Sequence, residues 1–221
     1  MDTITLSPHP FSALNLNMML VIYLIAITAE AMSGALAAGR RRMDIFGVAV
    51  IASVTALGGG TIRDVILGNY PIGWTQHPEY LYIVLSAGLI TVLVARYMHH
   101  LKQIFLVLDA LGLVAFSVIG CTIALGLNYT TAVVIIAGML TGISGGVVRD
   151  VLCNQVPIVF RRELYASVSL FVCVLFLILK SFGLGENITM LVCFTGGVTF
   201  RLLAIRFHWR LPVFSYDSRW E

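Results

Sequence analysis

Two stretches of this chain share one pattern: GGTIRDVILGNYP covers Gly59–Pro71, and GGVVRDVLCNQVP covers Gly145–Pro157. A constant offset of 86 residues carries the glycine pair, the Arg-Asp pair and the proline of the first stretch onto the second. The same offset carries Gly34 onto Gly120, upstream of each motif. Because these residues coincide in register, we interpret the chain as an internal repeat with one GGxxRD motif in each copy.

The composition predicts a membrane protein. Of the 221 residues, 59% are hydrophobic and only 11% are charged, whereas soluble domains carry about 25% charged residues. The net charge of +3 is spread between apolar blocks, which argues against a nucleic-acid partner. The first residues lack the positive region of a signal peptide, so we expect the first apolar block to be retained. The four cysteines form no CxxC or Cys/His cluster, and we expect neither a metal site nor a cofactor.

Seven segments are long and apolar enough to cross a bilayer, which requires about 20 residues. They define an N-terminal external segment (1–17), repeat 1 (18–98), repeat 2 (104–182), a seventh helix (188–206) and a cytoplasmic tail (207–221). The expected spans are Met18–Ala38, Ile45–Leu67, Leu81–Met98, Ile104–Leu125, Thr131–Cys153, Leu164–Phe182 and Ile188–Ile205.

An odd number of spans in each repeat forces the second copy to insert upside down relative to the first. The predicted fold class is therefore an all-α polytopic membrane protein with seven transmembrane helices: two inverted three-helix repeats plus a seventh helix. Basic residues at alternate span ends predict an outside N-terminus and a cytoplasmic C-terminus. Eleven Lys and Arg residues lie on the predicted inner side, with Lys180 opposite: Arg40, Arg41, Arg42, Arg96, Lys102, Arg161, Arg162, Arg201, Arg206, Arg210 and Arg219.

Glycines are clustered near the middle of two spans, at Gly58–Gly60 and at Gly145–Gly146. Each glycine costs about 1 kcal/mol in a helix interior relative to alanine, so we expect a kink or an unwound turn at both places. Freed carbonyl oxygens there would replace part of the hydration shell of a monovalent cation passing Gly58, Gly59, Gly145 and Gly146. The alternative is that the glycines only allow close helix packing, as Gly138 and Gly142 are expected to do.

The Arg-Asp pairs predict two polar constrictions, one toward each membrane face. Adjacent side chains on a helix point about 100° apart, so Arg63 and Asp64 are not expected to neutralise each other, nor are Arg149 and Asp150. One member of each pair would face the lumen and the other would anchor to a neighbouring helix, or each arginine would only tie helix ends together.

Three further acidic residues lie in or beside the spans. Glu30 lies deep in the first span, where it would serve either an ion pathway or a buried hydrogen bond. Asp44 and Asp109 are interpreted as helix-start residues. An enzyme is not predicted, because no phosphate-binding lysine follows the glycines and no nucleophile and base are paired.

The doubled motifs GGGTIRDVILG and GGVVRDVL, each followed by a proline, resemble the prokaryotic trimeric intracellular cation (TRIC) channel family. SGALAAGRRRMDIFGV before the first motif and LDALGLVAFSVIGC before the second are similar to the same family. The chain also resembles the glycine-transporter-like (UPF0126-type) membrane proteins. The channel resemblance implies a homotrimer, one potassium-conducting pore per subunit between the second and fifth helices, and a prokaryotic inner membrane.

The leading hypothesis is therefore a monovalent cation channel whose partners are potassium or sodium ions and membrane lipid. Its predicted ion pathway comprises Gly58, Gly59, Gly60, Gly145, Gly146, Arg63, Asp64, Arg149, Asp150 and Glu30. The alternative is a secondary transporter of glycine or another small zwitterion, which inverted repeats fit equally well. A non-transporting membrane scaffold is a third possibility.

Overall fold

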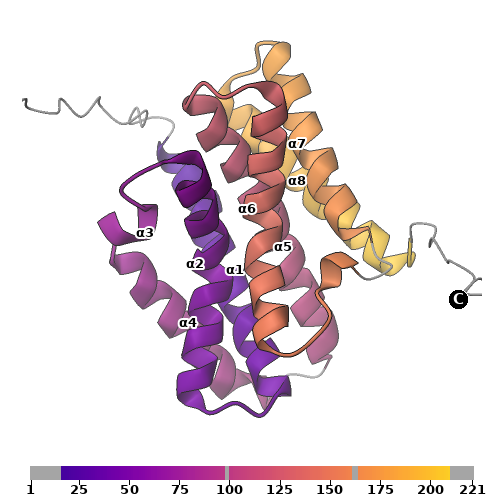
Figure 1. Cartoon of the computed structure of the whole chain (residues 1–221). Helices are drawn as coiled ribbons and strands as arrows, with labels where there is room; N and C mark the ends of the chain where they lie inside the picture. Colours follow the sequence, from indigo (N-terminus) through magenta and orange to yellow (C-terminus); the bar gives the residue numbers. More distant parts are fainter. Residues whose placement is uncertain (1–15, 98–99, 161–163, 210–221) are drawn as a thin grey trace, which may run out of the picture.

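The computed structural model describes residues 16–97, 100–160 and 164–209 (Figure 1). Within these ranges the chain forms eight α-helices and one 3-10 turn, η1 (Ile158–Phe160). The helices are α1 (Leu16–Arg40), α2 (Ile45–Leu67), α3 (Gly73–Gln76), α4 (Glu79–Ala95), α5 (Leu101–Gly126), α6 (Thr131–Leu152), α7 (Tyr165–Ser181) and α8 (Glu186–Arg206). Most of the external segment 1–17, most of the tail 207–221, and Arg161, Arg162, Arg210 and Arg219 lie outside the described residues.

Seven of these helices correspond to the seven predicted spans, and the short helix α3 was not predicted. In the described part of the chain, α1, α2, α5, α6 and α8 are each long and apolar enough to cross a membrane. The helices α4 and α7 are apolar but shorter, at 17 residues each. Large apolar side chains such as Phe46 and Ile136 are more than half exposed, which suits a surface that faces lipid rather than water.

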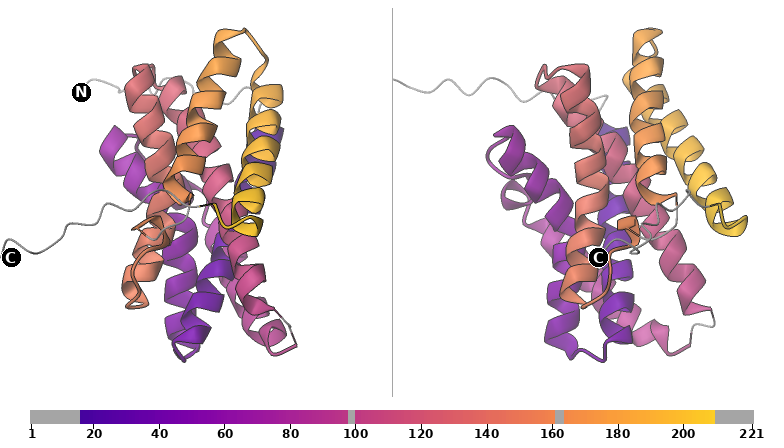
Figure 2. Two further views of the ribbon diagram at one scale, coloured as in Figure 1. Left: turned by 90° about the vertical axis from the view of Figure 1, so that its right-hand side faces the viewer. Right: turned by 45° about the vertical axis from the view of Figure 1, so that its right-hand side comes forward.

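Successive long helices alternate in direction (Figures 1 and 2). At the upper end of Figure 1 lie the end of α2, the α5–α6 turn and the α7–α8 turn. The α1–α2 turn and the end of α6 lie at the lower end. The helix α5 is central, because it contacts α1, α6, α7 and α8. The helices α7 and α8 pack together on one side, and α3 and α4 lie on the other (Figure 1).

Local signals account for the ends of α2. The Asp44 side chain accepts a hydrogen bond of 2.7 Å from the Gly47 amide, which satisfies a free donor at the start of the helix. The prediction that Asp44 begins a helix is therefore confirmed. At the other end Gly68 adopts the left-handed conformation with φ 66°, which glycine reaches without a steric cost.

The helices α2 and α6 cross at their glycines. A Cβ atom added to Gly59 would collide with the carbonyl oxygen of Thr141, and one added to Gly145 would collide with that of Thr55. Both helices run without interruption through these glycines. The prediction of an unwound turn is therefore wrong: the glycines lack a side chain so that two backbones can touch, and the helical hydrogen bonds stay intact.

The offset of 86 residues also relates contacts in space. A Cβ on Gly34 would lie 2.7 Å from Thr55 Oγ1, and a Cβ on Gly120 would lie 2.6 Å from Thr141 Oγ1. The pair α1 and α2 thus packs through the same two residue positions as the pair α5 and α6. The favoured packing role of Gly138 and Gly142 is confirmed, because a Cβ at either would clash with atoms of α5.

Candidate functional site

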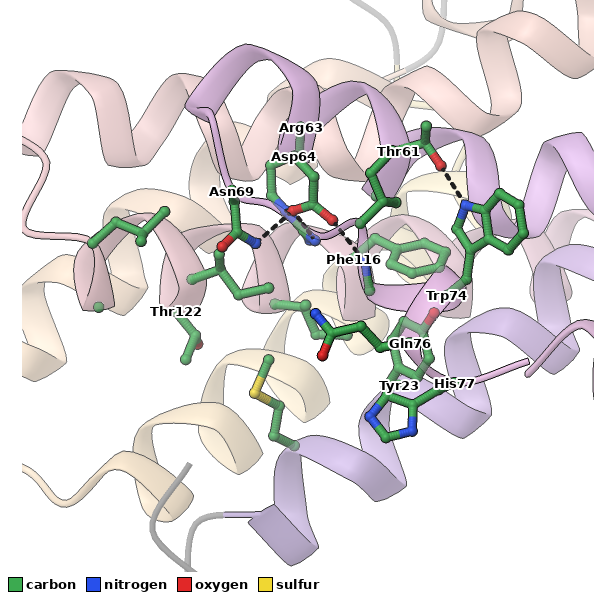
Figure 3. Close-up of a pocket in the computed structure, with 18 of the residues that line it drawn as sticks. Tyr23, Thr61, Arg63, Asp64, Asn69, Trp74, Gln76, His77, Phe116 and Thr122 are labelled. Carbon is green, nitrogen blue, oxygen red and sulfur yellow. Dashed lines mark hydrogen bonds and ion pairs between the residues drawn. The ribbon is translucent and has the colours of Figure 1, made fainter. Parts of the chain in front are cut away.

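A cavity of about 700 Å³ lies beside the last turns of α2 and the segment that follows this helix. It is enclosed by parts of α1, α2, α4, α5, α7 and α8 and by the segment that contains α3. Its lining combines aromatic rings with polar groups, including Tyr23, Thr61, Arg63, Asp64 and Trp74 (Figure 3). Such a mixed, concave space is typical of a binding or permeation site.

Arg63 and Asp64 form a closed pair at this cavity. The Arg63 guanidinium donates from Nε at 2.9 Å and from Nη2 at 2.7 Å to Asp64 Oδ1 (Figure 3). The expectation that these neighbours would not neutralise each other is wrong. The arginine side chain is long and flexible enough to reach the carboxylate of the next residue, although the two side chains leave the helix in different directions. Two of its guanidinium N–H groups then bond the same carboxylate oxygen.

Asp64 also holds the segment that follows α2. Its carboxylate accepts hydrogen bonds from Asn69 Nδ2 at 2.9 Å and from the Gly73 amide at 3.4 Å. The indole of Trp74 in turn donates to Thr61 Oγ1 at 3.1 Å. Asp64 is therefore the anchoring member of the first pair, and it fixes the chain that carries α3 over the cavity (Figure 3).

A second polar cluster surrounds Arg149 in the last turn of α6. Its guanidinium donates to Asp150 Oδ1 at 2.9 Å, to Asp109 Oδ1 at 2.7 Å and to Ser33 Oγ at 2.6 Å. Glu30 Oε2 lies 3.9 Å from Arg149 Nη1. All five side chains are buried. The adjacent pair Arg149 and Asp150 thus interacts directly, as its counterpart does, but here the arginine also bridges α1 and α5.

Aromatic rings complete this second cluster. The Arg149 guanidinium lies 4.7 Å from the centre of the Phe105 ring, and the Arg201 guanidinium lies 5.0 Å from the centre of the Tyr165 ring. Arg201 is 1% exposed. Asp150 accepts a hydrogen bond of 2.9 Å from the Ile158 amide, and it anchors the segment after α6 as Asp64 does after α2.

The structure divides the ten predicted pathway residues among three places. Gly60, Arg63 and Asp64 line the cavity. Gly59 and Gly145 lie in the crossing of α2 and α6. Glu30, Arg149 and Asp150 belong to the second cluster, and Gly146 borders it, because a Cβ there would lie 3.5 Å from Arg149 Nη2. Gly58 would meet only a side chain of its own helix.

Asp109 is the main residue that sequence reasoning misjudged. It was interpreted as a helix-start residue, but α5 begins at Leu101 and Asp109 is fully buried against Arg149. The apolar pattern predicts a span that begins at Ile104, close to this aspartate, whereas the helix already begins at Leu101. The burial of Asp109 could have been predicted from its neighbours in the sequence. Asp109 and Glu30 both occur among apolar residues of expected spans, where an ionised group requires a partner.

Comparisons with known proteins agree with this architecture. A family model named Glycine transporter matches residues 20–96 and 106–181. A UPF0126 membrane protein of Vibrio cholerae is 38% identical over 205 residues, which cover 92% of this chain and 86% of that protein. The UPF0126 inner membrane protein YadS of Escherichia coli is 35% identical over 208 residues, covering 90% and 99%.

Solved structures of TRIC cation channels share the fold. One, from a study of conductance through these channels, has a TM-score of 0.82 at 32% identity and covers 89% of this chain and 97% of its own. The trimeric channel of Rhodobacter sphaeroides has a TM-score of 0.83 at 30% identity, with 86% and 98% covered. The predicted resemblance to both groups is confirmed. With its apolar helices and inner-membrane relatives, this chain is an integral membrane protein that belongs to the Glycine transporter (UPF0126) family and has the fold of the TRIC cation channels.

Proposed function

We propose that this protein is a cation channel that conducts potassium through a pore in each subunit, between α2 and α6. The observation that carries the proposal is its likeness to prokaryotic TRIC cation channels, with TM-scores of 0.82 and 0.83 at 32% and 30% identity. The likeness extends over nearly the full length of those channels. A match of this extent includes the surroundings of both GGxxRD motifs.

The cavity at the end of α2 supports a cation pathway. Its volume of about 700 Å³ is many times the share of one water molecule in the liquid, about 30 Å³, so a hydrated ion fits within it. The arginine there would oppose a cation if it stood alone. However, Arg63 is paired with Asp64 at 2.7 Å, which removes most of that repulsion.

The proposed pathway runs from this cavity past Gly60, through the crossing of α2 and α6, and on toward Gly146. At the crossing, the proposed pathway passes the backbone of Gly58, Gly59 and Gly145. The polar side chains along the pathway lie on either side of the crossing: Arg63 and Asp64 on one side, and Glu30, Arg149 and Asp150 on the other. Because α2 and α6 touch at Gly59 and Gly145, the proposed pathway requires the two helices to separate slightly when ions pass.

The proposal includes two inverted repeats, 18–98 and 104–182, with α8 outside them. Equivalent packing at Gly34 and Gly120 supports this symmetry. We further propose a homotrimer in a bacterial inner membrane, with the N-terminus outside. The relatives support the inner membrane and the trimer, because one is an inner membrane protein and another is a trimeric channel.

Recording from purified protein in planar bilayers under a potassium gradient tests the proposal. We expect single-channel currents that reverse near the potassium equilibrium potential. Silent bilayers, formed with protein that remains folded, would contradict a channel.

The family name Glycine transporter suggests one second candidate, a carrier of glycine, which the likeness to solved cation channels does not favour. Radiolabelled glycine uptake into liposomes, measured on the same preparation, separates the two. Saturable uptake with counterflow and no current would establish the carrier and exclude the channel.

A further inference from the structure

The two ends of the molecule differ at positions that the repeat makes equivalent. The offset of 86 residues carries Tyr23 onto Asp109 and Glu30 onto Phe116. Tyr23 and Phe116 line the cavity beside Arg63, and their ring centres are 6.3 Å apart. The same pair of repeat positions therefore holds two aromatic rings beside Arg63 and two carboxylates beside Arg149.

The space beside the arginines differs in the same way. A Cβ on Gly60 would have a single neighbour outside its own helical backbone within 4 Å, Arg63 Nη2 at 3.8 Å. At the equivalent Gly146 a Cβ would meet the Tyr165 hydroxyl at 3.0 Å and Arg149 Nη2 at 3.5 Å. The cavity end is open beside its glycine, whereas polar side chains fill the corresponding space at the other end.

Three acidic side chains of the second cluster share one ion-pair partner. Glu30, Asp109 and Asp150 each lie against the guanidinium of Arg149, whereas Arg201 lies over the Tyr165 ring. Across the residues that the structure describes, the buried atoms of this cluster without a hydrogen-bond partner are two carboxylate oxygens, Glu30 Oε2 and Asp109 Oδ2, and two donors, Arg149 Nη2 and Tyr165 Oη. Isolated buried carboxylates are costly unless a cation compensates them, so these two oxygens are poised to accept a cation.

We propose that Glu30 and Asp109 form a monovalent-cation site at the closed end of the pathway, and that the Arg149 guanidinium occupies it as a tethered cation. The inference rests on the proposed function, because it treats this cluster as the inner gate of the channel. The gate opens when Arg149 releases these carboxylates and a permeating ion takes its place.

The charge of the cluster selects the class of ion. When the Arg149 guanidinium leaves and one potassium ion enters, the net charge among the buried carboxylates is unchanged. A divalent ion would add a charge that the low-dielectric interior does not compensate. Carboxylate oxygens, here those of Glu30 and Asp109, are suitable replacements for part of the hydration shell of an alkali cation.

A binding experiment tests the site without requiring a current. Thermal unfolding of the full-length protein in detergent is compared in potassium chloride and in N-methyl-D-glucamine chloride. We expect Arg149→Gln to gain a saturable, potassium-dependent rise in melting temperature that the wild type lacks. The double variant Arg149→Gln/Glu30→Gln should lose that rise. A folded Arg149→Gln protein that is indifferent to potassium would overturn the site.

A variant that retains the positive charge covers the case in which Arg149→Gln does not fold. Arg149→Lys leaves one ammonium group as the tethered cation of the cluster. We expect no potassium-dependent stabilisation, because the ammonium already compensates the carboxylates and a further ion would add an uncompensated charge. A potassium-dependent rise in the melting temperature of folded Arg149→Lys protein would equally refute the proposal.

Ser33→Ala tests the gate with every charge in place. The substitution removes the 2.6 Å hydrogen bond from Arg149 Nη1 to the Ser33 hydroxyl. Loss of a hydrogen bond to a charged group changes an equilibrium constant about tenfold, here the one between the closed and open states. We expect the open probability to rise about tenfold. The matched control is Ser117→Ala, which removes a buried serine hydroxyl that bonds Ser169 at 2.7 Å and should leave the open probability unchanged.

The outcomes separate this inference from the proposed function. Potassium-stabilised Arg149→Gln protein in silent bilayers would uphold the cation site and refute the channel. A conducting wild type, with Ser33→Ala indistinguishable from Ser117→Ala and no potassium effect on Arg149→Gln, would uphold the channel and refute the gate.

Discussion

Gly59 of α2 lies directly against the carbonyl group of Thr141 in α6, and its equivalent Gly145 lies against the carbonyl group of Thr55. Each helix thus presents a glycine to the backbone of the other at one crossing. Because main-chain atoms cannot move aside as a side-chain tip can, the crossing has no room for a methyl group. This relationship explains the first glycine of each GGxxRD motif.

Gly59→Ala is expected to lower the free energy of unfolding by about 1–3 kcal/mol, the usual range for an overpacked contact. Gly60→Ala, one residue along, is the matched control, because its Cβ would have only a side-chain tip at 3.8 Å. It should stabilise the helix by about 1 kcal/mol through propensity. Thermal unfolding in detergent measures both, and equal effects of the two variants would contradict the close crossing.

Asp64→Asn is expected to reduce potassium conductance about fivefold at low salt, as for a barrier raised by about 1 kcal/mol. The variant leaves the Arg63 charge without its partner at 2.7 Å, so the cavity repels cations. In 1 M potassium chloride the Debye length falls to about 3 Å, and the defect should shrink.

The double variant Arg63→Gln/Asp64→Asn is the control for charge, because it removes both members of the pair. It should restore conductance relative to Asp64→Asn alone. A defect in Asp64→Asn that is insensitive to salt and persists in the double variant would show that the carboxylate acts only by anchoring the segment after α2.

Asp109→Ala is expected to cost about 3 kcal/mol of stability, since it removes one partner of a buried ion pair. Asp44→Ala, which removes a helix-start hydrogen bond of 2.7 Å to Gly47, should cost about 1 kcal/mol. Denaturation of both variants under one condition compares them. Similar small losses would restore the interpretation of Asp109 as a helix-start residue.

Thr61→Cys is expected to react with a membrane-impermeant thiol reagent added outside intact cells, because Thr61 lines the open cavity at the proposed outer end. The wild type supplies a low background, since its four cysteines are all buried. Mass spectrometry of the purified protein measures labelling. Labelling only from the cytoplasmic face would reverse the proposed orientation, and none from either face would contradict an open cavity.

The seven apolar helices and their approximate ends follow from the sequence alone, because a bilayer imposes a length and a composition on each span. Asp44 and Gly68 mark the ends of α2 through purely local chemistry, a capping carboxylate and a residue that tolerates positive φ. The offset of 86 residues likewise predicted which positions would be related, and Gly34 and Gly120 do make equivalent contacts.

What the glycines and the charges do was decided by tertiary structure. Whether Gly59 unwinds a helix or admits a neighbour depends on which backbone faces it, and sequence periodicity does not contain that information. The partners of Arg149 come from three other positions, Ser33, Asp109 and Asp150, on three helices. Their convergence depends on how the helices pack. The repeat predicts two similar arginine sites, whereas the structure has an open cavity beside Arg63 and a buried polar cluster around Arg149.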